Sequence, residues 1–226
     1  MVRLQGLIFD LDGTLLDSAP DLRQALNQTL RAHKRRDLTL DEVKHMVGDG
    51  MLPLLSRAFA ATGGPISDAE AYLRFQEFLL HYRDQKPDPA QIYPGGKETL
   101  EHYHKAGVKL GICTNKHEAS TIRLLEELNL KHYFTFIAGG DTFLVHKPHP
   151  DHVRGVIEGL SVPVANCVMI GDGRNDVLAA QGAGIPCLAV THGYGEDYGH
   201  LDADGLISGF NELPRALEKL GFTTNE

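Results

Sequence analysis

The sequence contains no tryptophan and only three cysteines: Cys113, Cys167 and Cys187. The cysteines lie far apart, each in or beside an apolar run, and none has the C-x-x-C spacing of a metal-ligand pair. We therefore expect three reduced thiols in the core, as is typical of a reducing compartment.

Long apolar runs are also missing. No segment approaches the roughly 20 residues that a membrane-spanning helix needs. The first apolar segment begins near Leu4 and leads directly into Asp10, so we expect no cleavable leader and a cytoplasmic location.

Positive charge is in deficit, with 22 lysine and arginine residues against 30 acidic ones and a formal net charge of −8. This balance argues against nucleic acid or an anionic membrane as a partner, because both attract basic surfaces. An anionic substrate would require local compensation of the acidic residues. The 226 residues, 42 % of them hydrophobic, are otherwise typical of a globular protein with a substantial core.

Helical periodicity dominates residues 18–88, and no strand pattern appears there. The first amphipathic segment runs from Leu22 to His33, and three more follow near 40–47, 52–60 and 72–82. Possible helix starts are Asp21, Asp41 and Ser67. Residues 63–65, Gly-Gly-Pro, indicate a break.

Strands and helices alternate in the rest of the chain. We expect strands at 4–9, 108–113, 134–138, 167–170 and 186–190, with a shorter one at 206–207, and helices between them and near 213–220. Near-continuous apolar strands alternating with helices predict an α/β fold with a Rossmann-like parallel sheet covered on both faces. We predict a core domain of residues 1–17 and 89–226 and an inserted, all-helical domain of residues 18–88.

Four polar clusters lie at or near the carboxyl ends of the predicted strands, where open parallel sheets bind ligands. They are Asp10-Leu11-Asp12-Gly13-Thr14, Thr114-Asn115, Lys147-Pro148-His149-Pro150, and the run from Gly171 to Asp176. Their shared position is more informative than any one of them.

Asp10 and Asp12 point to the same side of an extended chain, where two carboxylates repel each other unless a cation or a proton intervenes. Alone, this pair could be capping aspartates. With Asp172 near, hard oxygen ligands favour Mg²⁺. Gly13 allows a sharp turn after the acids.

The other clusters also have ordinary alternatives. Thr114 and Asn115 could cap a helix, and Lys147 could be a solvated charge, although it is the best cation to balance the acids. Asp172 and Asp176 could be capping or helix-dipole residues. The twelve histidines, including His146 and His149, are scattered and form no credible metal site.

Taken together, the four clusters and the helical insert resemble the haloacid dehalogenase superfamily, and specifically its phosphatases, over essentially the whole chain. The resemblance implies that Asp10 is the nucleophile that becomes an aspartyl phosphate and that Asp12 is the acid/base. Thr114, Asn115 and Lys147 would bind the phosphate.

The resemblance also implies a cofactor, Mg²⁺, held by Asp10, Asp172 and the main-chain carbonyl of Asp12, with Asp176 in support. Metal, lysine and backbone donors would then make an anion-binding pocket in an acidic chain.

Within the superfamily, the likeness is greatest to the bacterial phosphoglycolate phosphatases. It is carried by residues 9–18, FDLDGTLLDS, by residues 19–22, APDL, and by Val47-Gly48-Asp49-Gly50 in the insert. The last three resemble a substrate-selecting cap loop, although a plain turn between helices fits them equally. One departure is Gly173, where relatives often carry serine or threonine, which would slightly loosen the metal site.

The resemblance implies hydrolysis of a small phosphorylated metabolite, 2-phosphoglycolate first, by a monomer or a homodimer. Other small phosphates, such as pyrophosphate, nucleotides or sugar phosphates, and a sugar-phosphate mutase of the β-phosphoglucomutase type remain alternatives. A dehalogenase would have little need of Asp12 and Asp172. A non-enzymatic, receiver-like phosphate-binding domain would be about 120 residues long and lack the helical insert.

Overall fold

The computed structural model describes residues 1–195 and 198–224. Its main sheet has six parallel strands in the order β4-β3-β2-β5-β6-β7. Their bounds are β2 Gly6–Phe9, β3 Lys109–Cys113, β4 Phe134–Ala138, β5 Cys167–Gly171, β6 Cys187–Val190 and β7 Gly205–Ile207. This order confirms the predicted α/β fold, and it places β2 in the middle, between β3 and β5.

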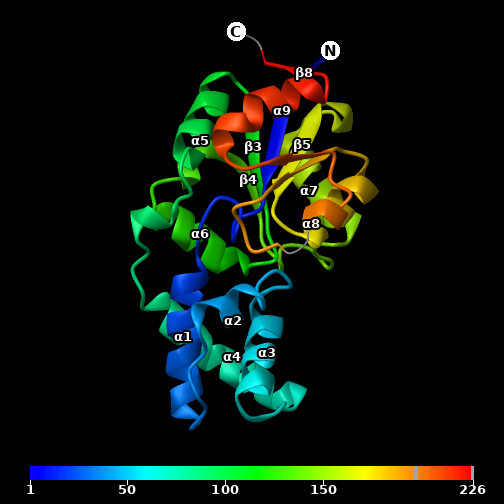
Figure 1. Cartoon of the computed structure of the whole chain (residues 1–226). Helices are drawn as coiled ribbons and strands as arrows, with labels where there is room; N and C mark the ends of the chain where they lie inside the picture. Colours follow the sequence, from blue (N-terminus) through cyan, green and yellow to red (C-terminus); the bar gives the residue numbers. More distant parts are fainter. Residues whose placement is uncertain (196–197, 225–226) are drawn as a thin grey trace.

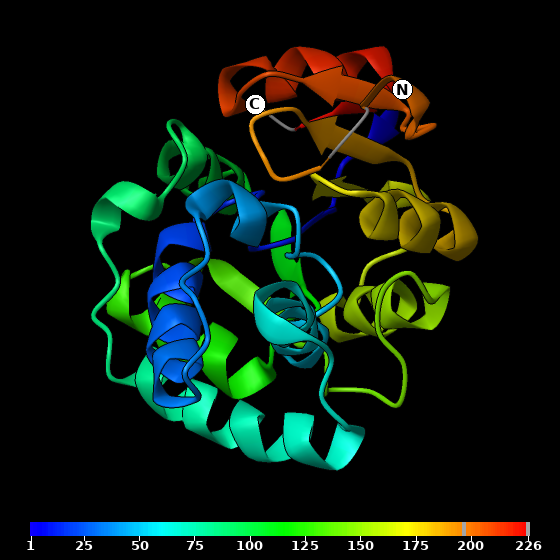
Figure 2. The same cartoon turned by 60° about the horizontal axis from the view of Figure 1, so that its bottom comes forward.

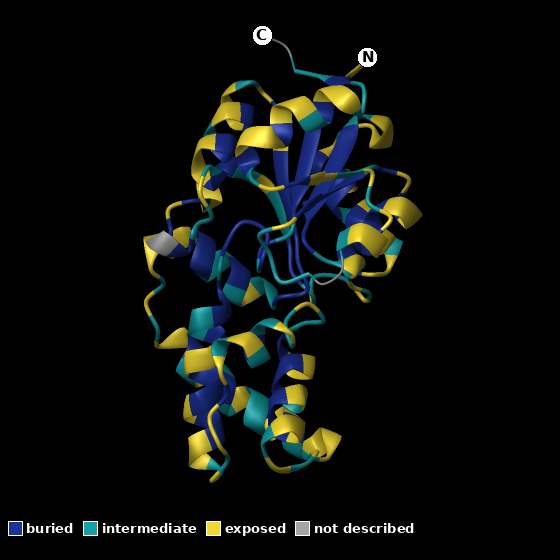
Figure 3. Ribbon diagram, viewed as in Figure 1, coloured by how far each residue is buried: buried dark blue, intermediate teal, exposed yellow. Residues whose placement is uncertain are grey.

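Helices cover both faces of this sheet (Figure 1). One buried cluster joins the sheet to α5 (Gly96–Lys105), α6 (Glu118–Glu127) and α9 (Leu213–Lys219), and the other joins it to α7 (Pro150–Leu160) and α8 (Arg174–Ala183). Along β2 the side chains alternate between the two clusters, with Phe9 in the first and Ile8 in the second. The strands are therefore buried on both faces, as Figure 3 shows in dark blue.

Four helices form a separate bundle at the end of the molecule opposite the chain termini (Figure 1). They are α1 Ala19–Ala32, α2 Leu40–Lys44, α3 Met51–Gly63 and α4 Asp68–Arg83. The bundle has its own buried cluster, which includes Leu26, Leu55 and Phe78. In Figure 2 it lies in front of the sheet. These features support a cap of residues 18–88, and the division into two domains stays a prediction. Residues 196–197 and 225–226 of the predicted core lie outside the described residues.

The helix starts show where local prediction was wrong. Asp21 and Asp41 lie in the first turns of α1 and α2, whose N-caps are Ser18 and Thr39. Ser67 is confirmed as the N-cap of α4, where its side chain accepts a hydrogen bond from Glu70 N–H.

Several short elements were not predicted. The expected strand at 4–9 begins only at Gly6. Before it, Val2–Arg3 (β1) pairs with Phe222–Thr223 (β8) in a small parallel sheet of its own. Helix α5 was also missed, and its sequence carries four charged or histidine side chains in its last six residues. Short 3₁₀ helices among the described residues are η1 Pro89–Gln91, η2 Lys131–Tyr133, η3 Val164–Asn166, η4 Tyr198–His200 and η5 Phe210–Glu212.

Two further expectations concern composition. All three cysteines are buried and free. Within the described residues, none of the helices combines the length and the apolar character that crossing a membrane requires.

Candidate active site

The predicted clusters come together at the carboxyl edge of the sheet. Asp10 follows β2, Thr114 follows β3 and Asp172 follows β5, while Lys147 lies in the loop between β4 and α7. Because β2 is flanked by β3 and β5, these loops surround Asp10. Two pockets meet at Asp10 and Asp12, one of about 340 Å³ over Asp172 and Lys147, and one of about 20 Å³ over Thr114 and Asn115.

A buried acidic cluster forms the floor of the larger pocket. Oxygen atoms of Asp10, Asp172 and Asp176 all lie within 4.8 Å of one another. The Nζ atom of Lys147 is 2.8 Å from Asp10 Oδ1 and 2.6 Å from Asp176 Oδ1. Lys147 thus forms ion pairs with both carboxylates.

The crowding of these acids shifts their protonation. The pKa of Asp172 is raised to about 8, first by burial and then by the negative charges of Asp176 and Asp10. Burial also raises the pKa of Asp10 to about 6, against the opposing field of Lys147. Although burial lowers the pKa of Lys147, Asp10 and Asp176 outweigh it and hold that pKa above its ordinary value.

These residues fit a divalent cation. If all three carboxylates are ionised, they leave about two negative charges that the one ammonium group does not compensate. Carboxylate oxygens are the ligands that Mg²⁺ prefers. Asp176 already accepts hydrogen bonds from Lys147 Nζ and from the N–H groups of Asp172 and Gly173. Asp10 and Asp172 therefore remain the better direct ligands, with Asp176 in support.

Asp172 is oriented by Thr14, which belongs to the first predicted cluster but was given no role there, and by Tyr194, which was not predicted. The Thr14 hydroxyl donates to its Oδ1 at 3.2 Å, and the Tyr194 N–H donates to its Oδ2 at 2.7 Å. The Tyr194 hydroxyl in turn donates to Asp17 Oδ1 and accepts from Ala19 N–H at the start of α1. The acidic cluster is thus tied to the point where the chain enters the helical bundle.

Asp12 has partners that the sequence analysis missed. Ser18 donates its hydroxyl to Asp12 Oδ1 at 2.5 Å, which explains why this N-cap makes no side-chain hydrogen bond to its own helix. The buried Lys116 ammonium lies 3.0 and 3.1 Å from the two carboxylate oxygens of Asp12. The signal for Lys116 was its place directly after Thr114 and Asn115, at the same strand end.

The two predicted phosphate ligands on this strand end have different surroundings. The Thr114 hydroxyl lines the small pocket and accepts a hydrogen bond from Lys116 N–H. The Asn115 amide instead donates to the carbonyls of Lys147 and Gly48, at 2.9 and 3.0 Å, and so joins the lysine loop to the helical bundle.

The predicted cap loop lies over the site. Gly48 and Gly50 have positive φ angles of 129° and 99°, which favour glycine. Asn175, beside the acidic cluster, donates to the Gly48 carbonyl and to Asp49 Oδ1. Gly48 and Gly50 line the small pocket and Asp49 lines the larger one, so this loop closes over both pockets.

Two histidines near Lys147 make hydrogen bonds to the main chain. His149 is the N-cap of α7, where its side chain accepts from Asp151 N–H. His152, which was not singled out from the sequence, is buried and accepts from Lys147 N–H. Burial, with the nearby Lys147 charge, lowers the pKa of His152 to about 4, so its ring is neutral.

Comparison with known proteins agrees with this geometry. The family model for haloacid dehalogenase-like hydrolases matches residues 7–190. The chain is 41 % identical over 215 residues to a phosphoglycolate phosphatase of Agrobacterium fabrum, covering 94 % of this chain and 92 % of the relative. It is 39 % identical over 211 residues to one of Caulobacter vibrioides, covering 93 % and 89 %.

Solved structures extend the likeness to the whole fold. A crystal structure titled a predicted phosphoglycolate phosphatase from Haemophilus somnus superposes with a TM-score of 0.88 at 26 % identity, covering 95 % of this chain and 98 % of that one. A β-phosphoglucomutase from Clostridium difficile, at 21 % identity and a TM-score of 0.76, shares the fold. From the family model and the relatives together, the chain belongs to the haloacid dehalogenase-like hydrolase family, as one of its phosphatases.

Proposed function

We propose that this protein hydrolyses 2-phosphoglycolate to glycolate and phosphate through an aspartyl phosphate on Asp10. The observation that carries the proposal is the position of Asp10. Its carboxylate belongs both to the acidic cluster and to the small pocket closed by the helical bundle.

In the first step, a carboxylate oxygen of Asp10 attacks phosphorus and the bond from phosphorus to the glycolate oxygen breaks. Asp12, in its protonated form, gives its proton to that leaving oxygen. In the second step, a water molecule attacks the phosphoryl group and transfers a proton to Asp12. The bond between phosphorus and Asp10 then breaks, and phosphate leaves.

Negative charge on the transferring group needs donors at fixed positions. Lys147 is held by Asp10 and Asp176, so its ammonium is oriented before the substrate arrives. Thr114 presents its hydroxyl to the same pocket. Mg²⁺, held by Asp10, Asp172 and the main-chain carbonyl of Asp12, would supply charge neutralisation of the phosphoryl oxygens.

The size and walls of the small pocket support a small substrate. Its volume of about 20 Å³ corresponds to one or two water molecules, at roughly 10–15 Å³ each by the same measure. The helical bundle contributes four apolar side chains to it: Leu22, Val47, Met51 and Leu54. A sugar would leave several hydroxyl groups without hydrogen-bond partners in this pocket. Glycolate would bring only one methylene group and one carboxylate into it. The names of the similar curated relatives support the same substrate.

The test is a comparison of kcat/KM for 2-phosphoglycolate with pyrophosphate, a nucleoside monophosphate and glucose phosphates, with added Mg²⁺. We expect 2-phosphoglycolate to be preferred by at least about tenfold, corresponding to about 1.4 kcal/mol, and EDTA to abolish turnover reversibly. A sugar phosphate turned over with a higher kcat/KM would refute the substrate, and conversion of glucose 1-phosphate to glucose 6-phosphate would identify a mutase.

A further inference from the structure

Lys116 is a buried cation that the mechanism above does not use. Its side chain has no exposed surface, and its Nζ atom lies 3.0 Å from Asp12 Oδ1. On another side, Nζ lies 4.8 Å from the centre of the Tyr82 ring, at the end of α4. Burying an ammonium group costs several kcal/mol in desolvation, so a lysine at the edge of a substrate pocket needs a compensating role.

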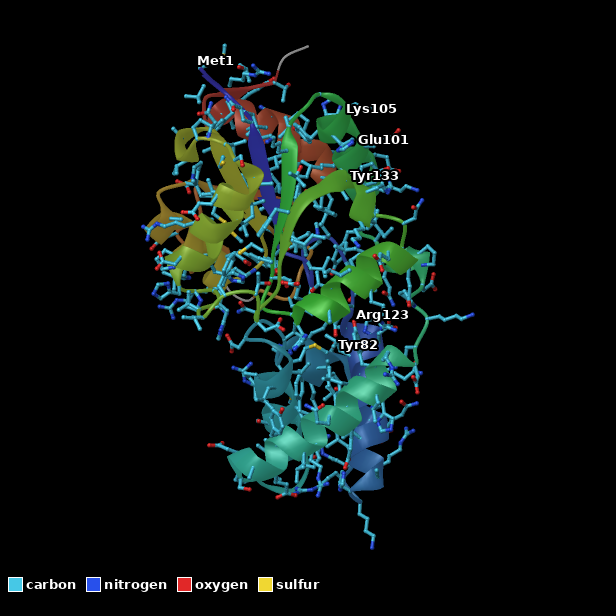
Figure 4. The ribbon with its side chains drawn as sticks, turned by 180° about the vertical axis from the view of Figure 1, so that it is seen from behind. Met1, Tyr82, Glu101, Lys105, Arg123 and Tyr133 are labelled. Atoms are coloured by element: carbon cyan, nitrogen blue, oxygen red, sulfur yellow. The ribbon has the colours of Figure 1, made fainter. Side chains whose placement is uncertain are left out.

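The contact with Tyr82 fixes Lys116 from the side of the helical bundle. The Arg123 guanidinium lies 5.6 Å from the centre of the same ring and donates to the Tyr82 carbonyl at 3.1 Å. Figure 4 shows Tyr82 and Arg123 beside each other where α4 approaches α6. Tyr82 is itself 2 % exposed. The lysine is therefore held in place before any substrate binds.

No other lysine or arginine among the described residues lines the small pocket. Lys44, Lys147 and Arg174 line the larger pocket instead. Of these, Lys147 is paired with Asp10 and Asp176, and Lys44 lies 3.9 Å from Asp17. Arg174 is exposed. A second anionic group on a substrate whose phosphate lies at Asp10 thus meets one cation in the small pocket, Lys116.

We infer that Lys116 binds the carboxylate of the substrate and selects phosphate esters that carry a carboxylate one carbon from the ester oxygen. This inference rests on the proposed function. The ammonium group has three N–H donors, and the two oxygens of Asp12 use at most two of them. The third side of the ammonium group faces the Tyr82 ring. A substrate carboxylate in the small pocket therefore shares the donors that Asp12 accepts, and Asp12 releases one of them when it is protonated for the first step.

The apolar wall strengthens this selection. Leu22, Val47, Met51 and Leu54 offer no side-chain donors, so the carboxylate has few partners in the pocket besides Lys116. A neutral group of the same size fits the wall but gains nothing from the cation. The preference should therefore depend on the charge of the substituent and not on its size.

The experiment compares the wild-type enzyme with Lys116→Met on two substrates, 2-phosphoglycolate and ethyl phosphate. Ethyl phosphate has the same ester and replaces the carboxylate with a methyl group. Methionine keeps the length and the apolar stem of lysine and removes its charge. A hydrogen bond to a charged group is worth about 1.5–3 kcal/mol. We therefore expect kcat/KM for 2-phosphoglycolate to fall about 10- to 100-fold more than kcat/KM for ethyl phosphate, mainly through KM.

Two controls separate the possible outcomes. Lys116→Gln keeps a donor without the charge and should lose less selectivity than Lys116→Met. An equal loss on both substrates would mean that Lys116 acts only through Asp12, and it would overturn the inference. The wild-type enzyme alone also tests the inference. Equal kcat/KM values for 2-phosphoglycolate and ethyl phosphate would overturn it.

Failure of the proposed function has a different signature. In that case the wild-type enzyme would turn over another phosphate ester but leave 2-phosphoglycolate unhydrolysed, and the inference would fall with it. If 2-phosphoglycolate is hydrolysed well and its advantage over ethyl phosphate survives in Lys116→Met, the proposed function stands and only the inference about Lys116 fails.

Discussion

Replacing Asp172 with asparagine should have opposite effects on stability and activity. In the metal-free protein Asp172 is a buried carboxylate beside two others, and its pKa rises to about 8 from a usual value of 3.8. Between these two values the folded state binds a proton that the unfolded state has lost. The stability of the metal-free wild type therefore falls as the pH rises from about 4 to about 8.

The size of this effect follows from the pKa difference. At about 1.4 kcal/mol for each pKa unit, the upper limit is ~6 kcal/mol. We expect about 2–3 kcal/mol, because part of the shift comes from Asp10, whose own pKa is raised to about 6 and which therefore gains a proton in the same pH range. Asparagine fits the local hydrogen bonds, since its oxygen accepts from Tyr194 N–H and its NH₂ donates to the Thr14 hydroxyl, which can also accept.

The measurement is urea denaturation of the wild type and Asp172→Asn in EDTA, at pH 5 and at pH 8.5. The two proteins should agree within about 1 kcal/mol at pH 5, and the variant should be about 2–3 kcal/mol more stable at pH 8.5. Added Mg²⁺ should stabilise the wild type and not the variant, which should also lose phosphatase activity. A variant that is less stable than the wild type at pH 8.5 in EDTA would refute the electrostatic account of this cluster.

Three further substitutions test separate parts of the site. Asp10→Asn should abolish hydrolysis of an aryl phosphate while circular dichroism shows a folded protein, because Lys147 keeps its pair with Asp176; retained turnover would remove Asp10 from the nucleophile role. Gly13→Ala should inactivate the enzyme, because φ is +86° there and a Cβ atom would collide with the Asp172 carboxylate. Loss of EDTA-reversible activity is the readout, and normal activity would contradict the close packing. Gly173→Ser should fold normally, because φ is −129° and the nearest atom to an added Cβ is 3.8 Å away. As an N-cap it should add a few tenths of a kcal/mol to stability, measured by thermal denaturation, and a marked loss would show that the loop has no room for a side chain.

Much of the fold and of the acidic cluster could be predicted from the sequence because the signals are local. Apolar runs end at Phe9, Cys113 and Ile170, and each is followed within two residues by a polar side chain that parallel strands bring to one edge. The helical bundle was predicted from its periodicity alone. The shortest elements could not be predicted, because two-residue strands such as β1 and β8 carry no periodic signal.

The partners of Asp12 could not be found in this way. Lys116 has the sequence context of a solvated lysine, and its burial depends on Tyr82, which comes from another helix 34 residues earlier in the chain. Ser18 could be predicted as a helix cap but not as a donor to Asp12, because its hydroxyl leaves its own helix to reach that carboxylate. Such contacts are set by how the bundle packs on the sheet, which one sequence does not specify.

The nucleophile can be tested directly by trapping the phosphoenzyme. Asp12→Asn removes the group that activates water, so the second step should be slower than in the wild type. The variant is mixed with ³²P-labelled 2-phosphoglycolate and Mg²⁺, quenched with acid and reduced with borohydride, which converts an acyl phosphate to an alcohol. We predict loss of the label on reduction and conversion of residue 10 to homoserine, detected by mass spectrometry. Label that resists borohydride, or a reduced side chain at any other position, would contradict the assignment of Asp10 as the nucleophile.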